Sequence, residues 1–147
     1  MEFTIDGVAY KARPMNAFTQ ADIVSLLSPI IAAGGAELVP WLKEMRDTAA
    51  VGGAGGLLDA NPAEALKHFG GLTRELAKMK SEDRRFILST CLELVDKRIK
   101  EGQWAPIWVP AAGRAADEAI NNNLWLMVRI AFQVIQGTLF PFFSASL

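Results

Sequence analysis

The chain begins with an alternation of apolar and polar side chains, which is typical of strands. The apolar positions lie on both sides of an Asp6-Gly7 pair, at Phe3, Ile5, Val8 and Tyr10. Asp-Gly is favoured in two-residue type I′ turns because both central residues need positive φ. The pattern predicts a β-hairpin over residues 1–13, with Ile5 opposite Val8 and Phe3 opposite Tyr10 on one apolar face.

Residues 16–95 show the spacing of three and four between apolar positions that indicates helices. We expect a helical body there, interrupted by the Gly-rich stretch 51–56. This stretch lacks the Gly-Lys-Ser/Thr ending of a phosphate-binding loop, so we interpret it as a linker. The expected helices run from Asn16 to Gly34, from 36 to 50, from Asn61 onward and from Ser81 onward.

Regular spacing breaks up over residues 96–114, where glycine and proline recur. We expect an irregular connection here that carries Trp104 and Trp108. Together with Ile107, these residues allow a short strand pair near 97–109. The two tryptophans are interpreted as pinning the connection to the body, with a binding role as the alternative.

The segment 115–147 is predicted to form a C-terminal apolar helix and tail, with the helix running from Ala115 to about Thr138. Between Leu124 and Phe143 the only charged residue is Arg129. An arginine in a membrane span costs roughly 2.5–3.5 kcal/mol, which argues against a transmembrane helix. A helix that is apolar nearly all round then belongs to a core or is covered by a partner, and both readings stay open.

Aromatic side chains gather at the end of this segment, around the helix-breaking Pro141. They either fold back onto the core or contact another chain, because aromatic residues are favoured anchors at interfaces. The candidate protein-binding residues are Trp125, Phe132, Phe140, Phe142 and Phe143.

Taken together, these elements predict a mainly α fold with about five helices. They are expected to form a single compact domain spanning 1–147, with an N-terminal β-hairpin. A chain of this length can bury one hydrophobic core.

Composition and charge exclude several function classes. Fifteen basic residues nearly balance sixteen acidic ones, so neither a nucleic-acid footprint nor a polybasic membrane patch is present. His68 is the only histidine and Cys91 the only cysteine, and Cys91 lies on an apolar helical stripe. No spacing of catalytic, cofactor-binding or metal-ligating residues is found. We therefore expect a protein-binding function and no enzymatic activity.

Three regions together resemble the tail assembly chaperones of long-tailed bacteriophages and prophages. The first runs from the hairpin through Asn16-Ala17-Phe18-Thr19-Gln20 to Leu26-Leu27-Ser28-Pro29. The second is Gly102-Gln103-Trp104-Ala105-Pro106-Ile107-Trp108 with Gly113-Arg114, and the third is Val134-Ile135-Gln136 with the aromatic end. The chain departs from that pattern at Asn121-Asn122-Asn123, where relatives tend to carry an acidic residue followed by apolar or proline positions.

The resemblance implies a viral late protein in the host cell cytoplasm that is absent from the mature virion. It implies binding to the tape measure protein, which it keeps soluble, and recruitment of tail tube protein subunits. A homo-oligomer is a further option, and no nucleic acid, membrane or cofactor is expected. The alternatives are a structural connector protein retained in the virion and a membrane-associated phage protein.

Overall fold

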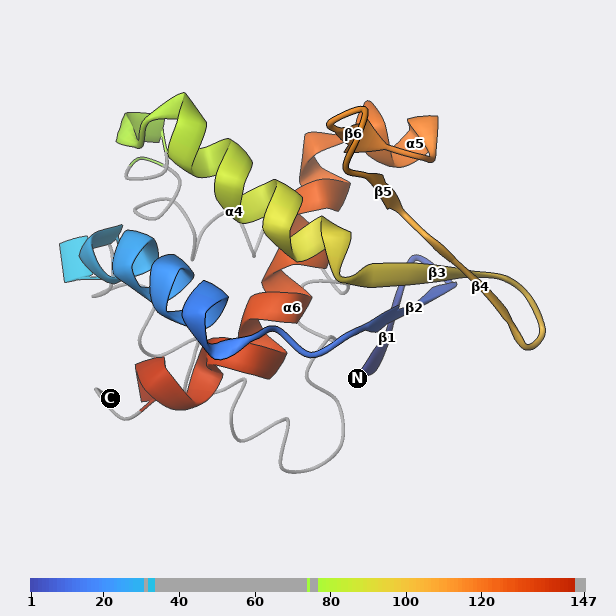
Figure 1. Cartoon of the computed structure of the whole chain (residues 1–147), viewed down its shortest axis with the longest axis horizontal. Helices are drawn as coiled ribbons and strands as arrows, with labels where there is room; N and C mark the ends of the chain where they lie inside the picture. Colours follow the sequence, from blue (N-terminus) through green and yellow to red (C-terminus); the bar gives the residue numbers. More distant parts are fainter. Residues whose placement is uncertain (31, 34–73, 75–76, 145–147) are drawn as a thin grey trace. The chain divides into compact units, whose positions relative to one another are not determined.

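The computed structural model of the chain describes residues 1–30, 32–33, 74 and 77–144, and for residues 140–144 it describes the backbone alone (Figure 1). The helices expected over 36–50 and from Asn61, the Gly-rich stretch 51–56 and His68 lie outside the described residues. The chain forms two compact units. The first consists of residues 1–16 and 85–138, and the second contains the described residues of 17–84 and 139–144.

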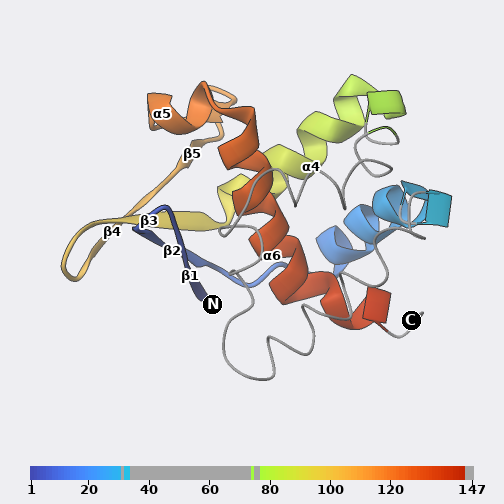
Figure 2. The ribbon, with the colours of Figure 1, turned by 180° about the vertical axis from the view of Figure 1, so that it is seen from behind.

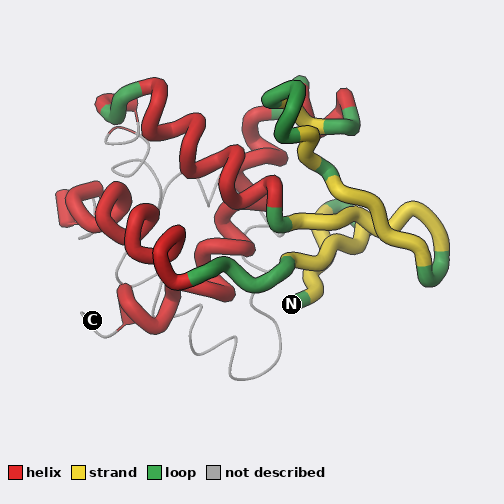
Figure 3. Tube along the Cα trace, in the orientation of Figure 1, coloured by secondary structure: helices red, strands yellow, loops and turns green. Residues whose placement is uncertain are grey.

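A four-stranded antiparallel sheet lies in the first unit, and its strands are drawn yellow in Figure 3. The order is β1-β2-β3-β4, with the bounds β1 (Glu2–Ile5), β2 (Val8–Ala12), β3 (Val95–Lys100) and β4 (Gln103–Pro106). A separate two-stranded sheet pairs β5 (Trp108–Val109) with β6 (Arg114–Ala115). The N-terminal hairpin is thus half of a larger sheet, because β2 pairs with β3 from a distant part of the sequence.

The N-terminal hairpin has the predicted register. Ile5 pairs with Val8 and Phe3 with Tyr10, whose rings stack with centroids 5.5 Å apart. Asp6 and Gly7 have φ of 50° and 80°, the two positive values that a type I′ turn requires. The Asp-Gly pair therefore sets this register by its backbone preference.

The two faces of the four-stranded sheet differ in exposure. Directly paired residues point to the same side, so the register divides the sheet into two sets of side chains. One face carries the buried Ile5, Tyr10 and Val95. The opposite face carries exposed residues, namely Glu2, Thr4, Arg98 and Pro106. The first unit therefore builds its core on one side of the sheet and leaves the other side open.

The prediction of a mainly α fold is wrong, because the fold is mixed α/β. Across the described residues 54% are helical and 24% lie in strands. The stretch 96–114, expected to be an irregular connection, belongs largely to β3, β4, β5 and β6. Four of the six residues of β3 are charged, which hides the alternation that would reveal a strand.

The segment predicted as one final helix is divided. Ala115 belongs to β6, and the helices are α5 (Glu118–Asn121) and α6 (Leu124–Ser144). Asn122 caps the end of α5, and the Asn123 side chain accepts a hydrogen bond of 3.1 Å from the Leu126 amide at the start of α6. The departure from the family pattern at these asparagines therefore serves the junction between two helices.

The predicted helix break at Pro141 is also wrong, since α6 continues past it to Ser144. Proline disrupts a helix by removing one backbone donor and by crowding the carbonyl four residues earlier. Pro141 lies in the last turn of α6, where few hydrogen bonds remain to be lost.

Helix α4 (Ser81–Glu93) begins at the predicted serine and has Glu82 and Asp83 in its first turn. Acidic residues there interact favourably with the helix dipole. The helix buries Ile87, Cys91 and Leu92. In the second unit, residues 17–30 are helical and bury one stripe, which consists of Ile23, Leu27 and Ile30.

The described residues include no helix with the length and apolarity needed to cross a bilayer.

The single thiol of the chain, Cys91, should be chemically inert in the folded protein. Its side chain is fully buried, and burial raises its pKa to about 12. Only the thiolate reacts with disulfide reagents, so at pH 8 we expect very slow labelling by Ellman's reagent under native conditions. Stopped-flow absorbance in increasing urea should show labelling that follows unfolding. Rapid stoichiometric labelling without urea would contradict this prediction.

Candidate protein-binding surface

The charged group in the apolar helix α6 has a partner in the N-terminal hairpin. The Arg129 guanidinium donates from Nη1 to Asp6 Oδ2 at 2.9 Å and from Nη2 to Asp6 Oδ1 at 3.1 Å. Two parallel bonds of this kind fix both distance and orientation. The ion pair therefore holds the turn of the β1–β2 hairpin against α6.

The two partners of this ion pair differ in burial. The Arg129 side chain is 9% exposed, whereas the Asp6 side chain is 70% exposed. The hydrogen bonds from Arg129 lower the pKa of Asp6 below its ordinary value of 3.8. Asp6 therefore stays ionised in the folded protein at neutral pH and compensates a charge that has left water.

The polar stripe of α6 points into the protein rather than into solvent. Arg129 and Gln133 are both buried. They lie next to the buried Ile130 and Val134 on α6. The Oε1 atom of Gln136 is also buried, and no donor to it is found among the described residues. The polar residues of α6 are thus largely withdrawn from solvent.

The N-terminal residue also lies against α6. A Cβ placed on Gly137 would overlap the sulfur of Met1. The glycine therefore leaves room for the Met1 side chain against the helix backbone.

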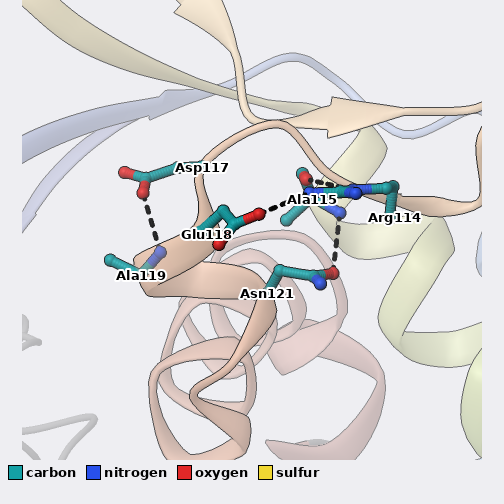
Figure 4. Close-up of polar contacts among 6 residues, drawn as sticks. All are labelled: Arg114, Ala115, Asp117, Glu118, Ala119 and Asn121. Carbon is teal, nitrogen blue, oxygen red and sulfur yellow. Dashed lines mark hydrogen bonds and ion pairs between the residues drawn. The ribbon is translucent and has the colours of Figure 1, made fainter.

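A second ion pair joins the sheet to α5. Lys97 Nζ on β3 donates to Asp117 Oδ2 at 2.7 Å, and both side chains are about one third exposed. Asp117 is the N-cap of α5, and its Oδ1 accepts from the Ala119 amide at 2.9 Å (Figure 4). The mutual hydrogen bond raises the pKa of Lys97 and lowers the pKa of Asp117.

Two further contacts fix β6 against α5, as Figure 4 shows. Asn121 Oδ1 accepts a 3.2 Å hydrogen bond from the Ala115 amide, and Arg114 Nη2 lies 3.3 Å from Glu118 Oε1. The arginine–glutamate pair is exposed and contributes little, whereas the asparagine satisfies a buried backbone group. The β5–β6 turn and α5 therefore form one small structural element.

The β3–β4 hairpin extends beyond β1 and β2 in both views of the chain (Figure 1 and Figure 2). Arg98 pairs with Trp104 and Lys100 pairs with Gln103, so Ile99 has no partner on β4. Such a β-bulge redirects a side chain and bends the strand. Ile99 is 62% exposed, although it is a large apolar residue.

An open cleft of about 330 Å³ lies at the base of this hairpin. Residues from the hairpin, from the chain after it and from the start of α5 line the cleft: Lys97, Arg98, Ile99, Ala105, Pro106, Ile107, Ala116 and Asp117. Most of these side chains are apolar, and the charged ones include the Lys97–Asp117 pair. The cleft is therefore an apolar surface with charges at its border.

The opposite, open face of the sheet carries a cation–π contact. Lys11 Nζ lies 4.6 Å from the centre of the Trp104 ring. A lysine above an indole contributes roughly 0.5–1 kcal/mol at an exposed site. The half-buried Trp104 thus contacts β2 across the sheet.

The residues predicted to bind a partner do not form an exposed cluster among the described side chains. Trp125 and Phe132 lie one above the other on α6, seven residues apart, and both are half-buried. The backbone of Phe140, Phe142 and Phe143 lies in the last turns of α6, and their side chains lie outside the described part of the chain. Whether these five residues bind a partner stays a prediction.

Other apolar side chains are exposed instead. Those of the first unit are Met1, Phe86, Ile99, Val109 and Leu124. None of them was predicted from the sequence, although an isoleucine inside the basic run Lys97-Arg98-Ile99-Lys100 is a visible signal. In the second unit Phe18 is 87% exposed. Within the described residues, no three His, Cys, Asp or Glu side chains are grouped as metal ligands would be.

These features define a small mixed α/β protein that leaves several large apolar side chains exposed on its first unit. The chain belongs to the phage tail assembly chaperone family, because the family model described as "Phage tail assembly chaperone protein, TAC" matches residues 6–147. No curated protein and no solved structure shows a significant match.

Replacing Asp6 by asparagine should destabilise the protein without disturbing the turn. Asparagine tolerates positive φ, so Asp6→Asn removes the charge and keeps the backbone conformation. We expect the free energy of unfolding to fall by about 1–2 kcal/mol, less than the roughly 3–5 kcal/mol for a pair buried on both sides, because Asp6 is largely exposed. Urea denaturation followed by circular dichroism measures this change.

Asp22→Asn is the matched control for this substitution, because Asp22 is an exposed carboxylate in the helix of residues 17–30. A double-mutant cycle with Arg129→Met isolates the coupling between the two side chains. Equal stability of Asp6→Asn and Asp22→Asn, with no coupling to Arg129, would contradict a stabilising role for the pair.

Acid should weaken the first unit. The folded-state pKa values of Asp6 and Asp117 are lowered, so their contribution to stability is present above about pH 4 and is lost as pH falls through the folded values. We expect the free energy of unfolding to decrease from about pH 5 to pH 2. In urea titrations at stepped pH, the free energy of unfolding of Asp6→Asn should decrease less steeply with falling pH than that of the unmodified protein. An identical pH dependence of the two proteins would contradict a role of the Asp6 carboxylate in acid destabilisation.

Proposed function

We propose that this chain binds the tape measure protein, keeps it soluble and helps to recruit tail tube subunits around it. The observation that carries the proposal is the family match over residues 6–147. Members of the phage tail assembly chaperone family are expected to act on tail components, and the tape measure protein is the tail component most in need of such help. Its length and its exposed apolar seams would otherwise favour aggregation.

The surface of the first unit supports this proposal. A soluble protein that covers apolar client segments needs apolar side chains that its own fold leaves open. Ile99 and Leu124 are 62% and 66% exposed, and Val109 is 39% exposed. They lie on the β3–β4 hairpin, at the start of α6 and on β5. The Lys97–Asp117 pair holds this hairpin against α5.

We further propose that the protein acts in the host cytoplasm and leaves before the virion is complete. The half-buried Trp125 and Phe132 and the aromatic residues Phe140, Phe142 and Phe143 stay candidate contacts in this proposal. They would reach a client only if α6 or its end is part of the binding surface. Self-association through the same apolar groups is an additional expectation.

Co-expression with the tape measure protein encoded beside this chain tests the proposal. We expect the tape measure protein to shift from the insoluble to the soluble fraction and to co-purify with the chain through affinity and size-exclusion steps. A tape measure protein from an unrelated phage is the matched control. If the cognate protein stays insoluble and unbound in several such pairs, the proposed function is wrong.

Mass spectrometry of purified virions separates a chaperone from a connector that is retained. The chain should be absent from mature particles and present in lysates of the same infection. Detection in particles at the copy number of a tail component would assign it to the structural class.

A further inference from the structure

We propose that the cleft at the base of the β3–β4 hairpin binds an apolar side chain of the client that is flanked by carboxylates. The inference rests on the proposed function, because it takes an acidic, amphipathic segment of the tape measure protein as the occupant. It locates the contact at the hairpin rather than at the aromatic end of α6.

The β-bulge in β3 places an apolar side chain at the cleft. Ile99 lacks a partner on β4 and is 62% exposed, yet it lines the cleft together with Ala105 and Ile107. A β-bulge costs ladder hydrogen bonds and is commonly found where a side chain is redirected for function. The bulge here therefore supplies an apolar contact at the mouth of an apolar cleft.

Basic residues lie on both sides of Ile99 in β3. Arg98 and Lys100 flank Ile99, and neither has an ion pair within the described residues. The third basic residue of the strand, Lys97, is already paired with Asp117, whose second oxygen is occupied by the Ala119 amide. Of the charged residues that line the cleft, Lys97 and Asp117 neutralise each other, and Arg98 has no ion pair within the described residues. The lining therefore carries one uncompensated positive charge, which favours a carboxylate on the occupant.

The hairpin that carries the cleft lies at the edge of the sheet, where another chain can reach it. β4 is the last strand of the sheet, and the hairpin extends away from β1 and β2 in both views (Figure 1 and Figure 2). Pro106 on β4 cannot donate a backbone hydrogen bond, which discourages pairing of this edge with another strand. Side-chain insertion into the cleft is thus favoured over strand addition.

Overlapping synthetic peptides that tile the cognate tape measure protein are the probe, and fluorescence anisotropy with the full chain is the measurement. We expect binding by peptides in which acidic residues flank an apolar one, with affinity that falls as salt is raised. The double charge reversal Arg98→Glu with Lys100→Glu should weaken binding at least about tenfold, which is the loss expected when attraction becomes repulsion at two positions.

Single substitutions then separate the cleft from the rest of the surface. Ile99→Ser should weaken peptide binding about fivefold to tenfold, and Ile99→Val should retain it, because valine keeps most of the apolar area. Phe86→Ser and Arg85→Glu are the matched controls, since both residues are exposed on α4 in the first unit but do not line the cleft. Circular dichroism confirms that every variant is folded.

Several results would overturn the inference. One is that no peptide binds, and another is that binding is unchanged in the charge-reversal and Ile99→Ser variants. A third is that the chain prefers peptides without acidic residues. Self-association that is lost in Ile99→Ser would show that a second copy occupies the cleft instead. The proposed function is judged separately by co-purification of the whole tape measure protein, which can succeed even when the cleft has no role.

Discussion

The first unit depends on the ion pair between Asp6 and Arg129. An arginine in the middle of a helix that is otherwise nearly all apolar must be either exposed or compensated, because an isolated buried charge costs several kcal/mol. Here Arg129 is buried, and the compensating carboxylate comes from a tight turn at the other end of the sequence. The turn that sets the hairpin register therefore also supplies the charge that lets α6 pack inward.

This dependence explains why the N-terminal hairpin is stable. A two-stranded hairpin alone is marginal in water, and three or more strands or a covering helix are needed. β3 supplies the third strand, and the Arg129 bonds hold the turn of the hairpin on α6. The turn preference of Asp6-Gly7, the pairing of β2 with β3 and the bonds from Arg129 all favour the same position of the hairpin on α6. Such agreement between local and long-range interactions is typical of sequences that specify one fold.

The hairpin and α4 could be predicted from sequence because their signals are local: a turn dipeptide with alternation, and a serine start with acidic residues. β3 could not, because it is mostly charged and is stabilised by partners from elsewhere, such as Tyr10 by pairing and Asp117 by charge. The sequence shows that Arg129 is unusual, because it is the only charged residue between Leu124 and Phe143. It does not show which residue pairs with Arg129. Ile99 is exposed at a one-residue register shift, and periodicity cannot reveal such a shift.

The same packing bears on where a partner can bind. Because Ile130, Ala131 and Val134 are buried together with Arg129 and Gln133, this part of α6 offers little surface to a partner. An interaction surface must come from side chains that the fold leaves outside, and the proposed surface uses those on the β3–β4 hairpin, β5 and the start of α6. The Lys97–Asp117 pair holds the base of that hairpin against α5, so little conformational freedom is lost there on binding. A protruding, fixed hairpin is therefore a better platform for a client than the buried faces of the most apolar helix.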